Sequence, residues 1–567
     1  MKHSFLFSLL NCFAICSFCQ IDNASVYKWG NLNPWQVTEF AINQDHYYEN
    51  TVNVIVPGKN PACPNGKIVV MTGQPRKDRN MIISDLVKKD GQINTGKGNY
   101  VQLGINVNNE SLATDNQIVR LKNGDLLAFK LGFLWSPITP KPFWGDWISD
   151  KTTNYKKMAR DAIFIYKSSD CGEKWSKVTV IDASKIDKGQ YGIPKKSKED
   201  DDEAEDINGQ DTTLYHSNGF DRQEVYYDPI GNMLYMTTQI ASGEYKITVG
   251  GKEVVIPKID EYGLFISNNN GGGWQLKYKT NKRMLVMTTT LNGRFFMFSE
   301  SGGKPVLFYT KKLKDYSLNS LTSVEIKYPE SGTPMMAEKD TNIHQKNKLA
   351  TISIARGPNN SVYLTYPVLN SSGKSEYVLC NVKINEDNPE VFGIANYAGM
   401  RIKASDPALS LSYGTLVESE AESIYYLTDI NTKITPKTLF YYIESTTGDN
   451  IPAASRKVSV KGLLIDHKTN MISDDFFLSR NTDNTGRWFK PFSVPDNGGI
   501  GHYTKGIAYI DNDKQNYIAQ WSEPNGIHVS IISGVDLWRQ DDKELLKNIN
   551  EMSKQKIFKF PAPVIKQ

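Results

Sequence analysis

A short run of charged and hydroxyl-bearing residues in the middle of the chain has the composition of a catalytic strand. Asp221, Arg222, Glu224 and Tyr226 lie close together within residues 221–229. Because side chains alternate along a strand, Arg222, Glu224 and Tyr226 share one side of it. Carboxylates there can exchange protons with a substrate, which makes Asp221 and Glu224 candidate catalytic residues, with Tyr226 as a third. The alternative interpretation is a structural ion pair with a packed tyrosine.

A second group combines aromatic rings with charged residues in one long segment. Trp135, Trp144 and Trp147 are followed by Arg160 and Asp161. Aromatic rings stack on the C–H faces of sugars, while charged side chains bond the sugar hydroxyls. We expect the three tryptophans and Arg160 to bind a sugar and Asp161 to act as a further acid/base candidate. The alternative is a long loop that folds on its own tryptophans.

Histidines and acids precede several of the expected strands. His216, His344 and Asp406 are expected to contact substrate, and His502 with Tyr503 could form a proton-transfer pair. These residues would meet on one face if the strands formed a ring, because the connections into each innermost strand then open on the same side. A histidine in a loop can equally be incidental.

Short strands joined by tight turns must hold these side chains. Residues 119–129 read as a strand, an Asn-Gly-Asp turn and a second strand, the pattern of a tight hairpin. The pattern recurs at intervals of roughly 50 to 100 residues. Its copies lie in segments 225–236, 287–298, 352–366, 409–427 and 506–521, with a weaker one in 52–84. This repeat predicts an all-β propeller of six blades, or seven if the N-terminal segment is counted. A pair of β-sandwiches is the competing architecture.

Composition and charge exclude several classes of function. The 567 residues carry a net charge of +4, spread over 66 basic and 62 acidic residues, so no basic surface indicates nucleic acid. The acidic block at residues 199–206 predicts a solvated loop, with loose Ca²⁺ binding as the alternative. Of the six cysteines, only Cys63, Cys171 and Cys380 lie beyond the N-terminal segment, which permits at most one disulfide. We predict a monomer with no cofactor and no assigned metal.

The N-terminus has the features of an export signal. Residues 1–19 combine a basic start with an apolar run. No later stretch reaches the roughly 20 apolar residues that a membrane-spanning helix needs. We therefore predict a secreted, periplasmic or cell-surface protein without a transmembrane segment. Its propeller would cover residues 20–535, and a short amphipathic helix and tail would cover residues 536–567.

Two octapeptides share the pattern Ser-x-Asp-x-Gly-x-x-Trp. The first spans residues 168–175, with Asp170 and Gly172 at the central positions, and the second spans residues 267–274, with Asn269 in place of the Asp. The Ser and Asp can bond backbone N–H groups, the Gly supplies a positive φ, and the Trp packs under the turn. The pattern resembles the Asp-box, or BNR, repeat of the sialidase superfamily. This resemblance implies a sialidase-like propeller in which the turn lies on the rim away from the active site.

The resemblance also implies what a sialidase site should contain. Sialidases hold the sugar carboxylate with three arginines, the first of which lies in an Arg-Ile-Pro sequence ahead of the first hairpin. In this chain the corresponding position is Thr114, and the nearest arginine is Arg120. This departure counts against authentic sialidase activity.

Three functions are consistent with these patterns. The leading one is a secreted glycoside hydrolase that acts on a complex or acidic glycan through its carboxylates. The second is a non-catalytic propeller that binds a glycan or a protein. The third is a polysaccharide lyase in which His502 and Tyr503 abstract a sugar proton.

Overall fold

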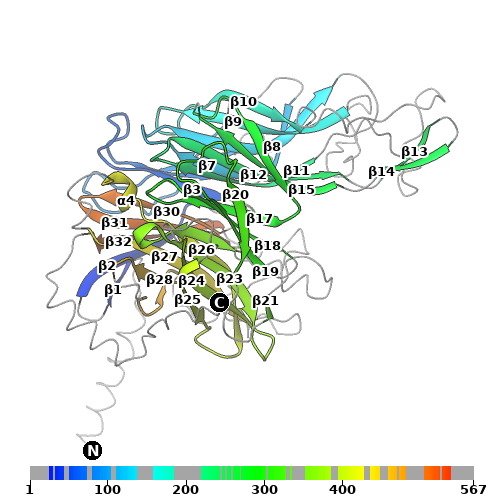
Figure 1. The fold of residues 1–567 in the computed structure, drawn as a ribbon. Helices are drawn as coiled ribbons and strands as arrows, with labels where there is room; N and C mark the ends of the chain where they lie inside the picture. Colours follow the sequence, from blue (N-terminus) through cyan, green and yellow to red (C-terminus); the bar gives the residue numbers. More distant parts are fainter. Residues whose placement is uncertain are drawn as a thin grey trace, which may run out of the picture.

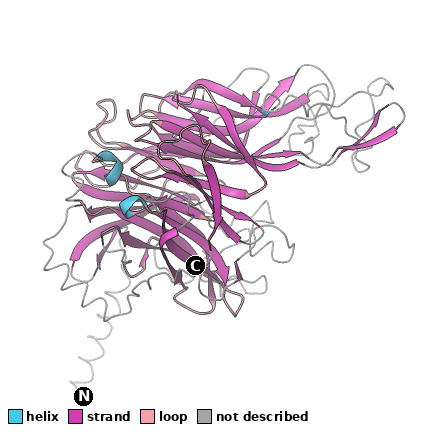
Figure 2. Ribbon diagram, in the orientation of Figure 1, coloured by secondary structure: helices cyan, strands magenta, loops and turns pink. Residues whose placement is uncertain are grey.

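The described part of the chain is built from β-strands with almost no helix, as Figure 2 shows. The helical segments among the described residues are the 3-10 turn η2 (Pro358–Asn360) and the short helix α4 (Ala421–Ile424). This computed structural model describes residues 24–29, 32–43, 50–72, 80–103, 110–136, 158–183, 219–242, 245–249, 252–256, 259–268, 270–301, 304–326, 333–334, 352–384, 394–426, 434–446, 458–468, 472–479, 504–523 and 526–537.

Seven antiparallel sheets follow one another along the chain as the blades of a propeller (Figure 1). Blades 1 and 2 contain β3 (Thr51–Ile55), β4 (Lys67–Met71), β5 (Met81–Asp85) and β6 (Asn99–Val101), then β7 (Glu110–Arg120), β8 (Leu126–Ser136), β9 (Met158–Ser168) and β10 (Ser176–Asp182). Blades 3 and 4 contain β11 (Gly219–Asp228), β12 (Met233–Ser242), β15 (Ile259–Ser267) and β16 (Gln275–Thr280), then β17 (Arg283–Thr289), β18 (Phe295–Ser301), β19 (Lys304–Thr310) and β20 (Leu321–Glu325). A separate hairpin between β12 and β15, formed by β13 (Tyr245–Val249) and β14 (Lys252–Ile256), extends away from the blades in Figure 1.

The last three blades complete the ring. Blades 5 and 6 contain β22 (Ser353–Arg356), β23 (Val362–Leu369), β24 (Ser375–Ile384) and β25 (Ile394–Ile402), with β21 (Thr333–Pro334) beside β23, then β26 (Leu409–Val417), β27 (Lys437–Thr446), β28 (Val458–Asp466) and β29 (Phe476–Phe477). Blade 7 contains β30 (Lys505–Asp511), β31 (Lys514–Glu523) and β32 (Gly526–Asp536), to which the N-terminal strands β2 (Leu32–Ala41) and β1 (Ala24–Trp29) are added.

The innermost strands surround one central channel. They contact one another in the order β3, β7, β11, β17, β22, β26 and β30, and β30 contacts β3 again. The pairing of β2 with β32 closes the ring between the two ends of the chain. The all-β propeller prediction is therefore confirmed with the higher of the two blade counts, because the weak N-terminal hairpin is blade 1. The alternative of two β-sandwiches is wrong, since seven sheets form one ring.

Strand direction gives the propeller two different faces. Because neighbouring strands are antiparallel, every innermost strand starts on one face, which we call the incoming face, and turns into the second strand on the other, the turn face. The connections between second and third strands also lie on the incoming face. The connections between third and fourth strands, including the first octapeptide between β9 and β10, lie on the turn face.

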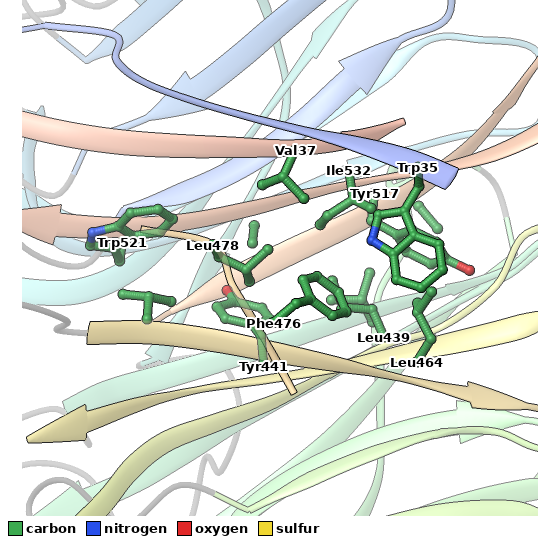
Figure 3. Packing of buried hydrophobic residues seen from close by; sticks show 14 of the residues in the cluster. Trp35, Val37, Leu439, Tyr441, Leu464, Phe476, Leu478, Tyr517, Trp521 and Ile532 are labelled. Carbon is green, nitrogen blue, oxygen red and sulfur yellow. The ribbon is translucent and has the colours of Figure 1, made fainter. Parts of the chain in front are cut away.

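Hydrophobic cores lie between adjacent blades. Figure 3 shows the cluster between blades 6 and 7, where Trp35, Tyr441 and Trp521 are buried with smaller aliphatic residues. The ring of Trp35 lies 5.5 Å from that of Phe476 in an edge-on arrangement. Each such aliphatic or aromatic side chain contributes about 1.5–3 kcal/mol when it is withdrawn from water. The strands are apolar on both faces because each blade packs against two others.

The octapeptide turn of blade 2 has the bonds that its sequence predicts. The Ser168 hydroxyl accepts from the Gly172 amide at 2.9 Å and donates to Asp170 Oδ1 at 2.9 Å. The Trp175 indole donates to the Gly172 carbonyl at 2.7 Å. Gly172 has φ 85°, a conformation that side chains oppose.

Both octapeptides also pack against the preceding blade. A Cβ at Gly172 would lie 3.1 Å from Ile83 of blade 1, and a Cβ at Gly271 would lie 3.1 Å from Leu127 of blade 2. The second turn keeps the tryptophan bond, since the Trp274 indole donates to the Gly271 carbonyl at 2.9 Å. Its Asn-for-Asp position, Asn269, lies outside the described residues. The glycines thus allow close contact between blades.

Several other predictions can be compared with the structure, and their outcomes differ. The expected hairpin at 409–427 is wrong in its second half, because β26 ends at Val417 and is followed by α4, so that β27 begins only at Lys437. A disulfide joins Cys63 of blade 1 to Cys171 of blade 2, within the predicted limit of one. The predicted signal segment 1–19 and the helix beyond Leu537 lie outside the described residues. In the part of the chain that is described, no helix has the length and apolar character needed to span a membrane.

Candidate functional site at the incoming end of the channel

Irregular pairing marks the incoming end of four innermost strands. The register between innermost and second strand shifts after Leu112 in β7, after Asp221 in β11, after Arg283 in β17 and after Ser412 in β26. Each shift falls in the first half of its strand. β-Bulges re-aim side chains and are over-represented beside active sites. The incoming end of the channel is therefore the candidate functional site.

An ion pair crosses the channel at this level. The Lys505 ammonium donates to both carboxylate oxygens of Glu224, at 2.7 and 2.6 Å. Glu224 belongs to β11 and Lys505 to β30, and these strands are not neighbours in the ring. About a quarter of each side chain is exposed, 26% for Glu224 and 24% for Lys505. The pair is therefore partly accessible to solvent.

The start of β30 is held in place by hydrogen bonds of the Thr504 hydroxyl. The Thr504 hydroxyl donates to the Tyr413 carbonyl at 2.9 Å and lies 2.8 Å from the Thr415 hydroxyl. Tyr413 lies in the β26 bulge with φ 51°, an unusual conformation for an aromatic residue. The bulge exposes the backbone carbonyl that Thr504 requires, and Thr504 directly precedes Lys505. The bulge in blade 6 therefore fixes the position of a cation in blade 7.

A group of polar side chains, which we call the floor, lies at the turn-face end of the channel. The Tyr226 hydroxyl lies 3.3 Å from Glu418 and accepts from Arg356 at 3.2 Å. Glu418 also accepts from the Thr288 hydroxyl and, at 2.9 Å, from the Arg356 backbone amide. Arg356 is 1% exposed and its Nε donates to the Thr289 carbonyl at 2.8 Å. These residues stand at the turn-face ends of blades 3 to 6, so they lie below the Glu224 ion pair.

The segment that follows β26 extends this floor across the channel. Glu420 is ion-paired with Arg120, whose guanidinium also donates to the Val54 carbonyl at 2.7 Å. Glu422 lies 3.2 Å from Nδ1 of His467. Glu418 and Glu420 therefore connect blade 6 with blades 2 to 5 at the turn face, whereas Glu422 contacts His467 within blade 6.

The environment of Tyr226 opposes its ionisation. Burial, reinforced by the neighbouring Glu418 carboxylate, raises the pKa of Tyr226 far above its usual range, although Arg356 acts in the opposite direction. A nucleophilic phenolate would need a lowered pKa. The surroundings of Tyr226 therefore favour the packed structural tyrosine over the predicted catalytic role.

The remaining predicted site residues divide into four groups. The backbone places Trp135 near the end of β8 and Arg160 and Asp161 near the start of β9, all toward the incoming face. Asp221 and Arg222 lie in the bulged half of β11. Asp406 lies in the turn before β26, where its carboxylate accepts from the Ala408 amide at 2.8 Å. Six residues lie outside the described part of the chain, namely Trp144, Trp147, His216, His344, His502 and Tyr503.

Sequence reasoning missed three residues of the channel. Lys505 lies two residues after Tyr503 of the predicted His502-Tyr503 pair, so a strand start beside that pair was an available signal. Arg356 and Glu418 lie at strand ends, with nothing in their local sequence to connect them. Within the described ranges no group of three or more histidines, cysteines, aspartates or glutamates could hold a metal ion. The acidic block at 199–206, the alternative Ca²⁺ site, lies outside these ranges.

Comparison with known proteins gives only distant structural similarity. No protein-family model matches the chain, and no curated protein matches it. The chain is similar to Trypanosoma rangeli sialidase at 9% identity, covering 94% of this chain and 62% of that one with a TM-score of 0.31. A mutant of that sialidase displaying trans-sialidase activity is similar at 10% identity, covering 85% of this chain and 60% of that one, with a TM-score of 0.32.

A second kind of solved structure is also similar. Xylan beta-1,4-xylosidase from Bacillus halodurans C-125 has 10% identity, covering 87% of this chain and 96% of that one with a TM-score of 0.26. The chain spans about three fifths of the length of the sialidase chains, 62% and 60% for the two above. At these TM-scores the similarities carry no argument about the site. It is the closed ring of seven four- and five-stranded sheets that makes this chain an all-β, seven-bladed propeller.

Proposed function

We propose that this protein is an exported, carbohydrate-active propeller that hydrolyses glycosidic bonds at the incoming end of its channel. The observation that carries the proposal is the Glu224 carboxylate, which is accessible in the channel at the level of the four bulges. The floor lies at the opposite, turn-face end of the channel, so Glu224 lies nearer to the incoming face. Carboxylates in a partly enclosed site are the groups that glycoside hydrolysis requires.

A second carboxylate is needed for this chemistry. Glycosidases use one carboxyl group as a general acid and another as a base or nucleophile on opposite sides of the bond. Asp161 and Asp221 are the candidates, because their strands bring both to the incoming face in adjacent blades. Arg160 and Arg222, carried by the same strands, and Trp135, at the end of β8, would orient the sugar. Tyr226 has no role in this proposal, because it belongs to the floor.

Export has independent support. The disulfide between Cys63 and Cys171 belongs to an oxidising compartment, since cytosolic reductants keep such thiols reduced. It fits with the signal sequence predicted for residues 1–19. We propose that the protein works outside the cytoplasm, as a monomer and without a cofactor.

A glycan panel tests the function. Wild-type protein is incubated with neutral and acidic oligosaccharides, and new reducing ends and unsaturated uronates are measured. New reducing ends that disappear in Glu224→Gln, Asp161→Asn or Asp221→Asn support hydrolysis. The matched control is Glu261→Gln, since Glu261 is also paired with a lysine but lies in β15, away from the channel. Unsaturated uronates would instead indicate the lyase alternative, and glycan binding without any product would indicate a binding propeller.

A further inference from the structure

We infer that the Glu224–Lys505 pair binds a neutral sugar with two adjacent hydroxyl groups. From the sequence alone, an acidic glycan was also a possible substrate. This inference rests on the proposed function, because it names the substrate class of the same site. Its basis is the chemistry of a complete ion pair in which about a quarter of each side chain is exposed, 26% for Glu224 and 24% for Lys505.

The pair offers both kinds of hydrogen bond without being broken. A lysine ammonium has three N–H donors, and two of them are directed to the oxygens of Glu224. The carboxylate has about four acceptor positions, so it can accept further bonds. One sugar hydroxyl can therefore donate to Glu224 while its neighbour accepts from the third N–H of Lys505. Adjacent hydroxyls on one ring have the spacing for such a two-point contact.

An acidic sugar does not suit the same pair. Its carboxylate or sulfate would need the Lys505 ammonium, which Glu224 already neutralises at 2.6 Å. Bringing in a second anion would place like charges together inside the channel and leave Glu224 without its cation. The net charge of the described pair is zero, so it gives no electrostatic attraction to an anion.

The other cations near the channel do not compensate. Arg356 is buried in the floor and is already paired with Glu418, at 3.4 Å. Arg120 is paired with Glu420 on the turn face. The charged positions that the strands bring to the incoming face include Arg160, Arg222 and Arg283 together with Asp115, Asp161 and Asp221, three bases and three acids. No excess of positive charge among these positions selects an acidic sugar.

The test compares matched glycans with the full-length protein. Neutral xylo-, manno- and galacto-oligosaccharides are set against glucuronides, sialyllactose and sulfated oligosaccharides, and affinity is measured by calorimetry at low and high salt. We expect the wild type to bind neutral sugars with little dependence on salt, because no net charge is neutralised. Glu224→Gln and Lys505→Met should each weaken this binding about tenfold or more, the effect of losing a hydrogen bond to a charged group.

A second test uses an affinity that a variant should gain. Glu224→Gln leaves the Lys505 ammonium without its anion, so this variant should gain affinity for acidic glycans, and salt should reduce that gain. The Glu261→Gln and Lys279→Met variants, which alter a surface pair 3.7 Å apart in blade 3, are matched controls and should change neither affinity.

The outcomes separate the two proposals. If the wild type binds or cleaves acidic glycans in preference to neutral ones, the proposed function stands and the neutral-sugar inference is overturned. If neutral sugars bind but Glu224→Gln and Lys505→Met leave their affinity unchanged, the inference is also overturned. If no glycan of either class is bound or cleaved, the proposed function fails and this inference fails with it.

Discussion

Glu420, which follows the innermost strand of blade 6, is ion-paired with Arg120, at the end of the innermost strand of blade 2. The two residues are separated by 300 positions in the sequence and approach each other over the turn-face end of the channel. With Glu418 and Glu422, this pair makes the segment after β26 a cover over that end. Through Glu418 and Glu420, this segment connects blade 6 with blades 2 to 5 at that end.

The two partners of this pair should respond differently to substitution. Burial raises the pKa of Glu420 above its ordinary value in spite of Arg120, so the ionised carboxylate depends on its cation. Arg120→Leu removes that cation and should lower the free energy of unfolding by about 2 kcal/mol, a value reduced because 25% of the Glu420 side chain is exposed. Glu420→Gln keeps the shape without the charge and should cost less than about 1 kcal/mol. Urea unfolding measures both, and equal losses would contradict this account of the pair.

Alkaline pH should destabilise the propeller. Burial raises the pKa values of Tyr226, Tyr413, Tyr441 and Tyr517 well above the ordinary value near 10. Above about pH 10 the unfolded chain releases these protons while the native state retains them, so stability present below that pH is lost as the pH rises. The free energy of unfolding, measured in urea from pH 7 to 11, should fall steadily above about pH 10.

One tyrosine can be separated from the others in that experiment. Tyr226→Phe removes one of the ionising groups, so the slope of stability against pH above about 10 should become shallower. The variant should also be less stable at neutral pH, because Arg356 and Glu418 lose a hydrogen-bond partner. An unchanged slope would mean that Tyr226 is accessible to solvent in the native state.

The fold was predictable from local sequence, because turns and strand alternation are local properties. The Asn-Gly-Asp turn before Leu126 and the octapeptide ending at Trp175 both specify a hairpin whatever the rest of the chain does. Blade count was harder, since the hairpin of blade 1 at residues 52–84 has only a weak pattern. The composition of blade 7 was also hidden, because the N-terminal strands β1 and β2 join β30–β32 in one sheet. Composition alone does not reveal that two ends of a chain share a sheet.

The site was predictable only in part, because its contacts join distant residues. Glu224 was identified from alternation within one strand, but its partner Lys505 lies 281 positions away. Arg356 is 130 positions from Tyr226, and the ring alone brings them together. The interpretation of Tyr226 as catalytic depended on knowing its neighbours, and the floor of the channel supplies neighbours that keep its proton in place.

The disulfide should account for a large part of the stability of blades 1 and 2. It closes a loop between residues separated by 108 positions and attaches the octapeptide turn to the preceding blade. Cys63→Ser with Cys171→Ser should therefore lower the free energy of unfolding by about 2–5 kcal/mol. Thermal unfolding with and without a reductant measures the effect, and the reductant should matter only for the wild type. Cys380→Ala, in the core of blade 5, should leave the response to the reductant intact.

Thr504 should control the Glu224–Lys505 pair without touching Glu224. Its hydroxyl anchors the start of β30 to the bulge carbonyl of Tyr413, so Thr504→Val frees the residue that carries the ammonium. A double-mutant cycle with Glu224→Gln and Lys505→Met should give a coupling energy of about 1 kcal/mol in the wild-type background, as expected for a partly exposed pair. In the Thr504→Val background that coupling should fall toward zero, whereas Thr504→Ser, which keeps the hydroxyl, should preserve it.

The coupling energy distinguishes positioning from general stability. Thr504→Val could also lower the overall stability simply by disturbing the packing around β30. In that case all four variants of the cycle would lose the same free energy of unfolding, and the Glu224–Lys505 coupling energy would be unchanged. A selective loss of coupling means that the β26 bulge, through Thr504, sets the geometry of the ion pair. The Tyr413 carbonyl that accepts from Thr504 lies in an unusual backbone conformation. A strained residue in β26 would then determine where β30 places its lysine.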